Sequence, residues 1–408
     1  MTVFTEKLYP WGGGAEYATW LFIKGLVKRG IKVVVFTCSY QDVPSKEHVE
    51  GAIIYNLRLT TGGKSKYATL PLTLKSIVSK TIEKEVRYSD AVYIPRYWYI
   101  IIPYIRLYIK KPVIVHIHDY IPICPLAYLS YMSSKICSNF QISKCSKCVV
   151  YHEREQRRNI MEVLTSSILN VFGAWQIIRY CLKYASKIIF TSDYQKEIIC
   201  KHYNEIIRRD VDISVIPNPI SEDLMDKNLV IDTYRPFAFL YSGGENRAKG
   251  FYELFKAIRK SQRSFHLYLL NMSKNKTIYY RNKVLYFMRK IPHKKYISML
   301  SRNVSAVIVP SLCPEAFPYS VIEAMVLGKV VVASRNGSIP SILGRGKGVF
   351  YIDPADTSEF SDVLDWVSGL SKDEIVDMGL KNRELILKKY DFESVIDNFI
   401  KVLESVVK

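Results

Sequence analysis

Residues 309–340 read VPSLCPEAFPYSVIEAMVLGKVVVASRNGSIP. The stretch starts at the end of an apolar run, 306–309, and passes through a loop containing Glu315 into a helical pattern containing Glu323. A β-branched run, 330–333, follows the helix. Two strands joined by a helix form the unit of a parallel sheet, whose ligands bind at the carboxyl ends of the strands. The stretch therefore predicts an α/β fold with a binding site in the Glu315 loop.

Similar apolar runs alternate with helical patterns over most of the chain. They occupy residues 31–36, 91–94, 112–117, 187–190, 213–216, 237–241 and 265–270. A chain of 408 residues is longer than one hydrophobic core usually supports, so we expect two Rossmann-like domains. Turn residues at 217–219 place the boundary, so that residues 1–216 form the first domain and residues 217–391 the second. The amphipathic segment 392–408 is expected to return to the first domain.

The chain is basic, because 58 Lys and Arg residues against 38 Asp and Glu give it a formal net charge of +20. Such a charge attracts anions, which could be nucleic acid, lipid head groups or phosphorylated substrates. No recognised nucleic-acid motif accompanies the charge, so we expect no nucleic-acid partner. The nearest candidate for a spanning segment, 97–109, is interrupted by Pro103 and Arg106, and the N-terminus lacks an export pattern. We therefore expect a cytoplasmic protein without a spanning helix.

Glu315 and Glu323 flank the start of the expected helix, where backbone N–H groups and carboxylates can bind anions and hydroxyls. Taken alone, the pair could be two solvated side chains. The surrounding residues favour a site, because the stretch resembles the signature of the retaining glycosyltransferases of family 4. The matching positions are Pro310, Ser311, Glu315, Phe317, Glu323, Ala324, Met325 and Gly328. The resemblance implies a GT-B fold, in which two Rossmann-like domains face each other across a cleft.

The same resemblance implies a nucleotide-sugar donor, with a UDP, GDP or ADP carrier, and no catalytic metal. Glu323 would accept hydrogen bonds from the ribose, and Glu315 would accept them from the sugar hydroxyls. The backbone amides of Phe317, Tyr319 and Ser320 would also bind the sugar. The sugar would be transferred with retention of configuration at its anomeric carbon.

A second match lies at residues 241–250, YSGGENRAKG, where family members hold the donor's phosphates with an arginine and a lysine. Lys249 matches the lysine, whereas Gly244 occupies the usual arginine position and leaves Arg247 as the nearest guanidinium. A glycine turn at a helix start also offers backbone amides to phosphate. Lys249, with Arg247, would stabilise the leaving diphosphate.

Two matches in the first half of the chain are looser. Residues 11–16, WGGGAE, resemble the first strand–helix loop of the family, where Gly13 and Gly14 let the backbone approach the donor. Alone, a glycine triplet would mean only a flexible turn. Residues 115–120, VHIHDY, resemble the family's histidine motif, in which His118 corresponds to a histidine that contacts the transferred sugar or its surroundings.

Four cysteines follow the histidine motif, and the last two form a C-x-x-C pair. They are Cys124, Cys137, Cys145 and Cys148. Four thiolates suit a tetrahedral structural zinc, and some members of the resembling family carry a similar cysteine set. Two disulfides are a second interpretation, which an ordinary cytosol disfavours, and unreacted buried thiols are a third. The residues alone leave all three open.

Basic and aromatic side chains are interleaved over residues 63–111. The aromatic ones are Tyr67, Tyr88, Tyr93, Tyr97, Trp98, Tyr99, Tyr104 and Tyr108. This combination suits an anionic membrane surface, although a solvated surface explains it as well. In the resembling family this region often meets the acceptor or the membrane, so we expect a glycan or lipid-linked acceptor and a peripheral location at the inner membrane face. The alternatives are a nucleotide-sugar hydrolase or epimerase, and a catalytically silent sugar-nucleotide-binding protein.

Overall fold

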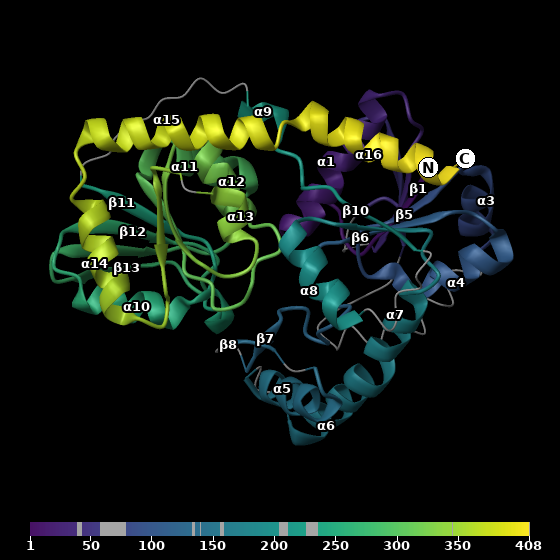
Figure 1. Ribbon diagram of the computed structural model, residues 1–408, viewed down its shortest axis with the longest axis horizontal. Helices are drawn as coiled ribbons and strands as arrows, with labels where there is room; N and C mark the ends of the chain where they lie inside the picture. Colours follow the sequence, from purple (N-terminus) through teal and green to yellow (C-terminus); the bar gives the residue numbers. More distant parts are fainter. Residues whose placement is uncertain are drawn as a thin grey trace. The chain divides into compact units, whose positions relative to one another are not determined.

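The computed structural model divides the chain into two compact units (Figure 1). The first unit comprises Met1–Met132, Cys137–Pro219 and Phe392–Lys408, and the second comprises Ser133–Ile136 and Ile220–Asp391. The structure describes residues 1–38, 43–57, 79–132, 135–138, 140–155, 159–203, 211–225, 236–344 and 346–407. The division after Pro219 lies three residues beyond the boundary expected from the turn residues, and the returning segment starts at Phe392.

The first unit is built on an eight-stranded sheet with the strand order β10-β9-β6-β5-β1-β2-β4-β3. The strands are β1 (Thr2–Thr5), β2 (Val34–Cys38), β3 (Lys46–Val49), β4 (Ala52–Leu57), β5 (Val92–Ile94), β6 (Val113–Ile117), β9 (Lys187–Phe190) and β10 (Asp212–Val215). All neighbouring strands are parallel except β3, which runs antiparallel to β4. The central strand β6 is buried along its whole length, as its β-branched residues predict for a strand covered on both faces.

Helices connect these strands. They are α1 (Gly14–Lys28), α3 (Lys80–Tyr88), η2 (Trp98–Ile101), α4 (Ile102–Tyr104), η3 (Ile105–Ile109), α5 (Ile142–Glu155), α6 (Ile160–Ile168), η4 (Leu169–Ala174), α7 (Trp175–Leu182), α8 (Asp193–Tyr203) and α16 (Phe392–Val407). Two short strands, β7 (Ser130–Tyr131) and β8 (Lys135–Ile136), precede α5. The elements α6, η4 and α7 run together as one helix, Ile160–Leu182.

The C-terminal helix α16 packs against α1 (Figure 1). Gly25 of α1 makes this approach possible, because a Cβ atom there would lie 2.5 Å from the Ile396 side chain. Phe399 packs on Phe22 with ring centroids 4.7 Å apart, and Arg29 forms an ion pair with Glu393 at the edge of the contact. The apolar stripe of the last helix is therefore buried within the first unit.

The second unit holds a seven-stranded sheet with the order β13-β14-β12-β11-β15-β16-β17. The strands are β11 (Ala238–Tyr241), β12 (Phe265–Leu269), β13 (Lys276–Tyr280), β14 (Lys283–Phe287), β15 (Ala306–Val309), β16 (Val330–Ser334) and β17 (Val349–Ile352). Its helices are α9 (Glu222–Met225), η5 (Arg247–Lys249), α10 (Phe251–Lys260), α11 (His293–Asn303), α12 (Tyr319–Val326), α13 (Ile339–Leu343), α14 (Thr357–Ser368) and α15 (Lys372–Lys389). Of these strands only β13 runs antiparallel to its neighbour, which is β14. Side chains of α11, α12 and α15 form one core cluster, and those of α10 and α14 form another.

Both sheets are parallel apart from one antiparallel strand each, so the predicted α/β class with two Rossmann-like domains is confirmed. The helix nearest to a spanning segment is not the one considered in the sequence. Among the described residues one helix, Ile160–Leu182, is long and apolar enough to cross a membrane by length and composition, and the sequence prediction missed it. Sequence reasoning had considered only residues 97–109, which form short helical segments with mostly buried side chains.

Candidate functional site

Glu315 lies in the loop after β15, as predicted, and its carboxylate contacts two neighbours. Lys249 Nζ donates to Glu315 Oε1 at 2.7 Å, and the Ser311 hydroxyl donates to the same oxygen. The loop is held by the segment after β16, because Ser338 N donates to the Glu315 carbonyl at 2.8 Å. Gly337 makes this approach possible: its φ is +70°, and a Cβ atom would lie 2.3 Å from Glu315 N.

Lys249 reaches Glu315 because its turn, η5, is packed closely on the same loop. Gly250 ends η5 with φ +76°, and a Cβ atom there would lie 1.8 Å from the Pro310 carbonyl oxygen. Asn246 caps the start of η5 by accepting a hydrogen bond from Ala248 N at 2.9 Å. The structure thus joins the two sequence motifs, 241–250 and 309–340, at the carboxyl ends of the adjacent strands β11 and β15.

Arg247 and Tyr241 belong to the same motif as Lys249, and only Tyr241 is buried. Arg247 is exposed at the start of η5, so its guanidinium lies at the surface of the turn. Tyr241, which sequence reasoning did not single out, donates its hydroxyl to the Gly244 carbonyl at 3.0 Å. Burial and the nearby Glu315 raise the pKa of Tyr241, so this hydroxyl stays protonated and keeps the turn in place.

Glu323 is buried in α12 and pairs with a histidine that the sequence did not point to. His293, at the start of α11, places Nε2 2.6 Å from Glu323 Oε1. Burial raises the pKa of the Glu323 carboxyl, and the bond to His293 only partly offsets this effect. A lone histidine after Pro292 carries no recognisable signal, because the partner carboxylate is thirty residues away in the sequence.

The start of α12 carries the other three predicted donor contacts. Phe317 and Pro318 precede the helix, and Tyr319 and Ser320 occupy its first turn. The Phe317 ring packs edge-on against Tyr319 and against Tyr390, with centroids 5.8 Å and 5.3 Å apart. The first N–H groups of a helix have no partner within that helix, so this end suits a polar or anionic ligand.

In the first unit, Gly13 is the residue before α1 and Gly14 is its first residue. Glu16 Oε2 accepts a hydrogen bond from Gly13 N at 2.8 Å, and Glu16 Oε1 accepts one from Arg96 at 2.8 Å. Arg96 also pairs with Asp119 at 3.4 Å. Burial alone would raise the pKa of Glu16, but the Arg96 charge and the backbone N–H bonds lower it. Arg96 therefore ties the glycine loop to the histidine motif.

His118 lies at the end of β6 beside His116, with ring centroids 4.3 Å apart. The Tyr93 hydroxyl is 3.0 Å from His116 Nδ1, whereas both ring nitrogens of His118 are buried without a hydrogen-bond partner. Burial, together with the Arg96 charge, lowers the pKa of His118 to about 3. The imidazole is therefore neutral at physiological pH, and its polar atoms can still accept or donate a hydrogen bond.

Comparison with known families agrees with these arrangements. The model of Glycosyltransferase Family 4 matches residues 12–224, and the model of Glycosyl transferases group 1 matches residues 232–374. The chain belongs to glycosyltransferase family 4. The first match lies mostly in the first unit, and the second match lies within the second unit. Together they contain every residue that the sequence assigned to the donor site.

Individual relatives are more distant. A lipopolysaccharide 1,2-N-acetylglucosaminetransferase of Salmonella typhimurium is 33% identical over 93 residues, which are 23% of this chain and 24% of that protein. The chain thus spans about a quarter of the length of the curated relative it matches. The sucrose-phosphate synthase of Thermosynechococcus elongatus has a TM-score of 0.73 at 15% identity, covering 99% of this chain and 98% of that one. Anabaena HepE in complex with UDP-glucose has a TM-score of 0.65 at 13% identity, covering 99% and 100%. These likenesses show the fold, and the predicted GT-B class is confirmed.

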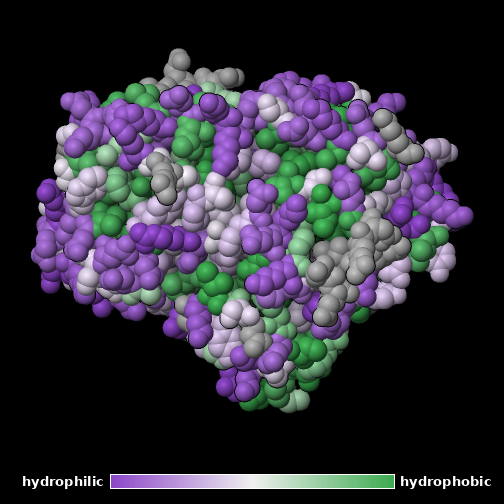
Figure 2. Space-filling view, viewed as in Figure 1, coloured by the Kyte–Doolittle hydropathy of each residue, from purple (hydrophilic) through white to green (hydrophobic). Residues whose placement is uncertain are grey.

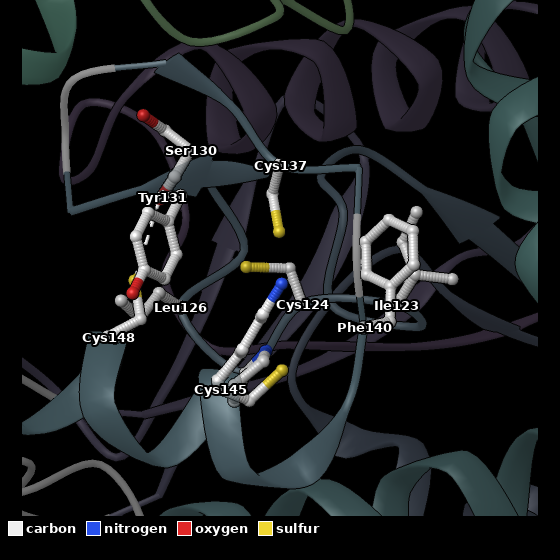
Figure 3. A pocket seen from close by; sticks show the side chains of 11 residues that line it. Ile123, Cys124, Leu126, Ser130, Tyr131, Cys137, Phe140, Cys145 and Cys148 are labelled. Atoms are coloured by element: carbon white, nitrogen blue, oxygen red, sulfur yellow. Dashed lines mark hydrogen bonds between the residues drawn. The ribbon is translucent and has the colours of Figure 1, made fainter.

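The four cysteines after the histidine motif line one small cavity of about 20 Å³ (Figure 3). Burial raises the pKa of Cys124 to about 12 and that of Cys145 to about 11, so these thiols are neutral as long as no metal is bound. The Cys148 thiol donates to the Ser130 carbonyl at 3.6 Å, and its sulfur accepts from Met132 N at 3.3 Å. Within the described ranges, no disulfide forms and no group of three or more Cys, His, Asp or Glu is arranged to hold a metal. The described structure therefore agrees with buried thiols. A zinc ion at these four cysteines stays a prediction.

The expected membrane contact at residues 63–111 includes aromatic residues that turn out to be buried. Residues 63–78, with Tyr67, lie outside the described residues. Of the described aromatic residues, Tyr93, Trp98 and Tyr99 are fully buried and form part of the core of the first unit, so they cannot contact a bilayer. Tyr88 and Tyr108 of the same region are exposed, so the membrane contact stays a prediction for these side chains. Interleaving of cations and aromatics in the sequence does not reveal which side chains point inward.

Proposed function

We propose that this protein is a retaining glycosyltransferase that moves a sugar from a nucleotide-sugar donor to a glycan acceptor. The single observation that carries the proposal is the cluster of Lys249, Ser311 and Glu315, in the loop that leads into the helix of the buried Glu323. These residues lie at the carboxyl ends of parallel strands, where such folds bind ligands, and this supports a cation for phosphate and carboxylates for hydroxyls. Membership of the glycosyltransferase family supports it, as does the UDP-glucose bound by Anabaena HepE.

Each residue of the cluster has a proposed role in donor binding. Lys249 stabilises the diphosphate as negative charge develops on it, with Arg247 as a second cation, and this needs no metal ion. Before the donor binds, the 2.7 Å pair with Glu315 holds the ammonium in position, so little reorganisation is needed. Glu315 then accepts hydrogen bonds from sugar hydroxyls. Glu323, oriented by His293, accepts them from the ribose.

The remaining contacts to the donor come from backbone groups and from the first unit. The amides of Phe317, Tyr319 and Ser320 bind the sugar at the start of α12. Gly13 and Gly14 let backbone approach the donor.

His118 contributes to the transfer step as a hydrogen-bonding group. Its low pKa keeps the ring neutral, so it acts by contact with the sugar and not by holding a positive charge. We assign the acceptor to the first unit and most of the donor contacts to the second.

The acceptor is proposed to be a glycan carried on a lipid, with the protein held peripherally at the inner face of a membrane. The net charge of +20 supports an anionic surface as partner, and the Salmonella relative is named for transfer to lipopolysaccharide. Charge alone would make such binding sensitive to salt, because the Debye length falls from about 10 Å at 0.1 M to about 3 Å at 1 M.

Thermal unfolding in the presence of UDP-, GDP- and ADP-sugars tests the donor site. A ligand that binds only the folded protein raises its apparent stability, by about 2.7 kcal/mol at a hundred times the Kd. We expect one nucleotide to stabilise the wild type and none to stabilise Glu323→Ala. If no nucleotide sugar shifts the unfolding temperature of the wild type, the proposal fails. Release of the sugar into water in the presence of acceptors would instead favour a hydrolase.

A further inference from the structure

The helix Ile160–Leu182 in the first unit has one face fixed on the protein. Buried residues recur every three or four positions along it, as expected for one face of a helix. The buried residues are Val163, Ser166, Ser167, Asn170, Val171, Ala174, Trp175, Ile178, Cys181 and Leu182. Trp175 anchors this side, because its Nε1 donates to the Ile121 carbonyl at 2.8 Å and its ring packs with Cys145 and Val149 of α5. The helix is therefore a part of the folded unit over its whole length.

The opposite face of the same helix is apolar as well. Six large side chains there are between 47% and 69% exposed, namely Ile160, Met161, Leu164, Ile168, Leu169 and Phe172. No charged residue occurs between Val163 and Ile178. Hydrophobic side chains gather at the lower end of the view in Figure 2, where Figure 1 draws α5 and α6. A helix packed on one side normally presents polar residues to water on the other, so this face marks an interaction surface.

The surroundings of this face are basic. Lys144, Lys147 and Arg154 are exposed on α5, which packs against α6, and Lys183 follows the end of α7. Basic residues outnumber acidic ones between Ile142 and Tyr184, although Glu155 and Glu162 are exposed there too. Near the end of the helix, Tyr180 is exposed and its hydroxyl lies 2.7 Å from that of Tyr184. Aliphatic side chains bordered by lysines, arginines and tyrosines match the interface of an anionic bilayer.

We propose that the face formed by Ile160, Met161, Leu164, Ile168, Leu169 and Phe172 inserts into an anionic lipid bilayer while the helix lies parallel to the membrane plane. The buried side explains why the helix lies on the membrane and does not cross it: Trp175 and Val171 would have to leave the core of the unit. The choice of a membrane as the partner rests on the proposed function, in which the acceptor is linked to a lipid. It adds a second surface to the one expected at residues 63–111, and it adds hydrophobic insertion to charge.

Co-sedimentation with vesicles tests the inference on the full chain. The variant Leu164→Glu, Ile168→Glu, Phe172→Glu places three carboxylates on the proposed face without touching the buried side. We expect it to lose at least tenfold in binding to vesicles of phosphatidylglycerol and phosphatidylcholine. The matched control, Tyr252→Glu, Tyr279→Glu, Leu380→Glu, changes three exposed apolar residues of the second unit and adds the same charge. It should bind the vesicles like the wild type.

Two further measurements keep this test separate from the donor site and from other partners. Stabilisation by a nucleotide sugar should be unchanged in the triple variant, so that loss of vesicle binding is not confused with failure of the proposed transferase. The wild type should keep part of its vesicle binding at 1 M salt, because insertion of apolar side chains is not screened. Equal vesicle binding by the triple variant and the wild type would overturn the inference. So would a wild-type dimer, seen by light scattering, that the triple substitution converts to monomer without a change in vesicle binding.

Discussion

Replacing Lys249 by methionine removes the cation at the proposed phosphate site while keeping most of the side chain's length. A hydrogen bond to a charged group contributes about 1.5–3 kcal/mol, so we expect the Kd for a stabilising nucleotide sugar to rise about 10- to 150-fold. The fold should be little affected. The Lys249 side chain is 31% exposed and Glu315 keeps its bond from Ser311, so the loss in unfolding free energy should be about 0–1 kcal/mol.

Isothermal titration calorimetry at fixed ionic strength measures this change. The matched control is Lys256→Met in α10, where the lysine is more exposed and lies 3.8 Å from Glu253. It removes the same charge from the same unit and should leave the donor Kd within about twofold. Equal affinity in the wild type and Lys249→Met, or an equal loss in both variants, would refute the assignment of Lys249 to the phosphates.

Three other predictions concern buried groups. Burial raises the pKa of Glu323, so its ionised form costs stability as pH rises above the unfolded value of about 4.5. Glu323→Gln should therefore gain unfolding temperature relative to the wild type between pH 4 and pH 7 while losing donor affinity, and a pH-independent difference would contradict this. His118→Ala should lose transfer activity with its fold intact, and because burial lowers the pKa of His118 to about 3, wild-type activity should show no titration of this residue between pH 5 and 8. A step near pH 6.5 that vanishes in His118→Ala would count against a neutral imidazole. Elemental analysis of the purified protein should find one zinc per chain, bound by Cys124, Cys137, Cys145 and Cys148, whereas zinc-free protein in which all eight cysteines react as thiols after unfolding would establish buried thiols.

Much of the second unit could be predicted from the sequence because its signals are local. The run 306–309, the loop with Glu315 and the helix with Glu323 occur in sequence as β15, loop and α12. The resemblance assigned Lys249 and Glu315 to one donor site, but their direct contact was not predicted and is explained by parallel topology, since both loops leave the same edge of one sheet. The pair of Glu323 with His293 could not be predicted, because a histidine in the first turn of another helix gives no pattern that names its partner.

The first unit was harder to predict because its important features depend on which way side chains point. Arg96, which follows β5, links Glu16 of α1 to Asp119, which follows β6, and nothing in its own sequence neighbourhood indicates this. Tyr93, Trp98 and Tyr99 looked interfacial by composition, yet the sheet and η2 turn them into the core. The helix Ile160–Leu182 was missed because Ser166, Ser167 and Asn170 interrupt the apolar run, although these polar residues lie on the buried side.

Sugar transfer itself tests the central claim most directly. The nucleotide sugar that stabilises the wild type, carrying a radiolabel in the sugar, is incubated with the protein and lipid-linked oligosaccharides in anionic vesicles. We predict that label enters the lipid-linked fraction, that NMR of the product shows the anomeric configuration of the donor, and that Lys249→Met lowers the rate at least tenfold. Label recovered only as the unhydrolysed donor or as sugar released into water, at the same level in wild type and variant, would contradict the account.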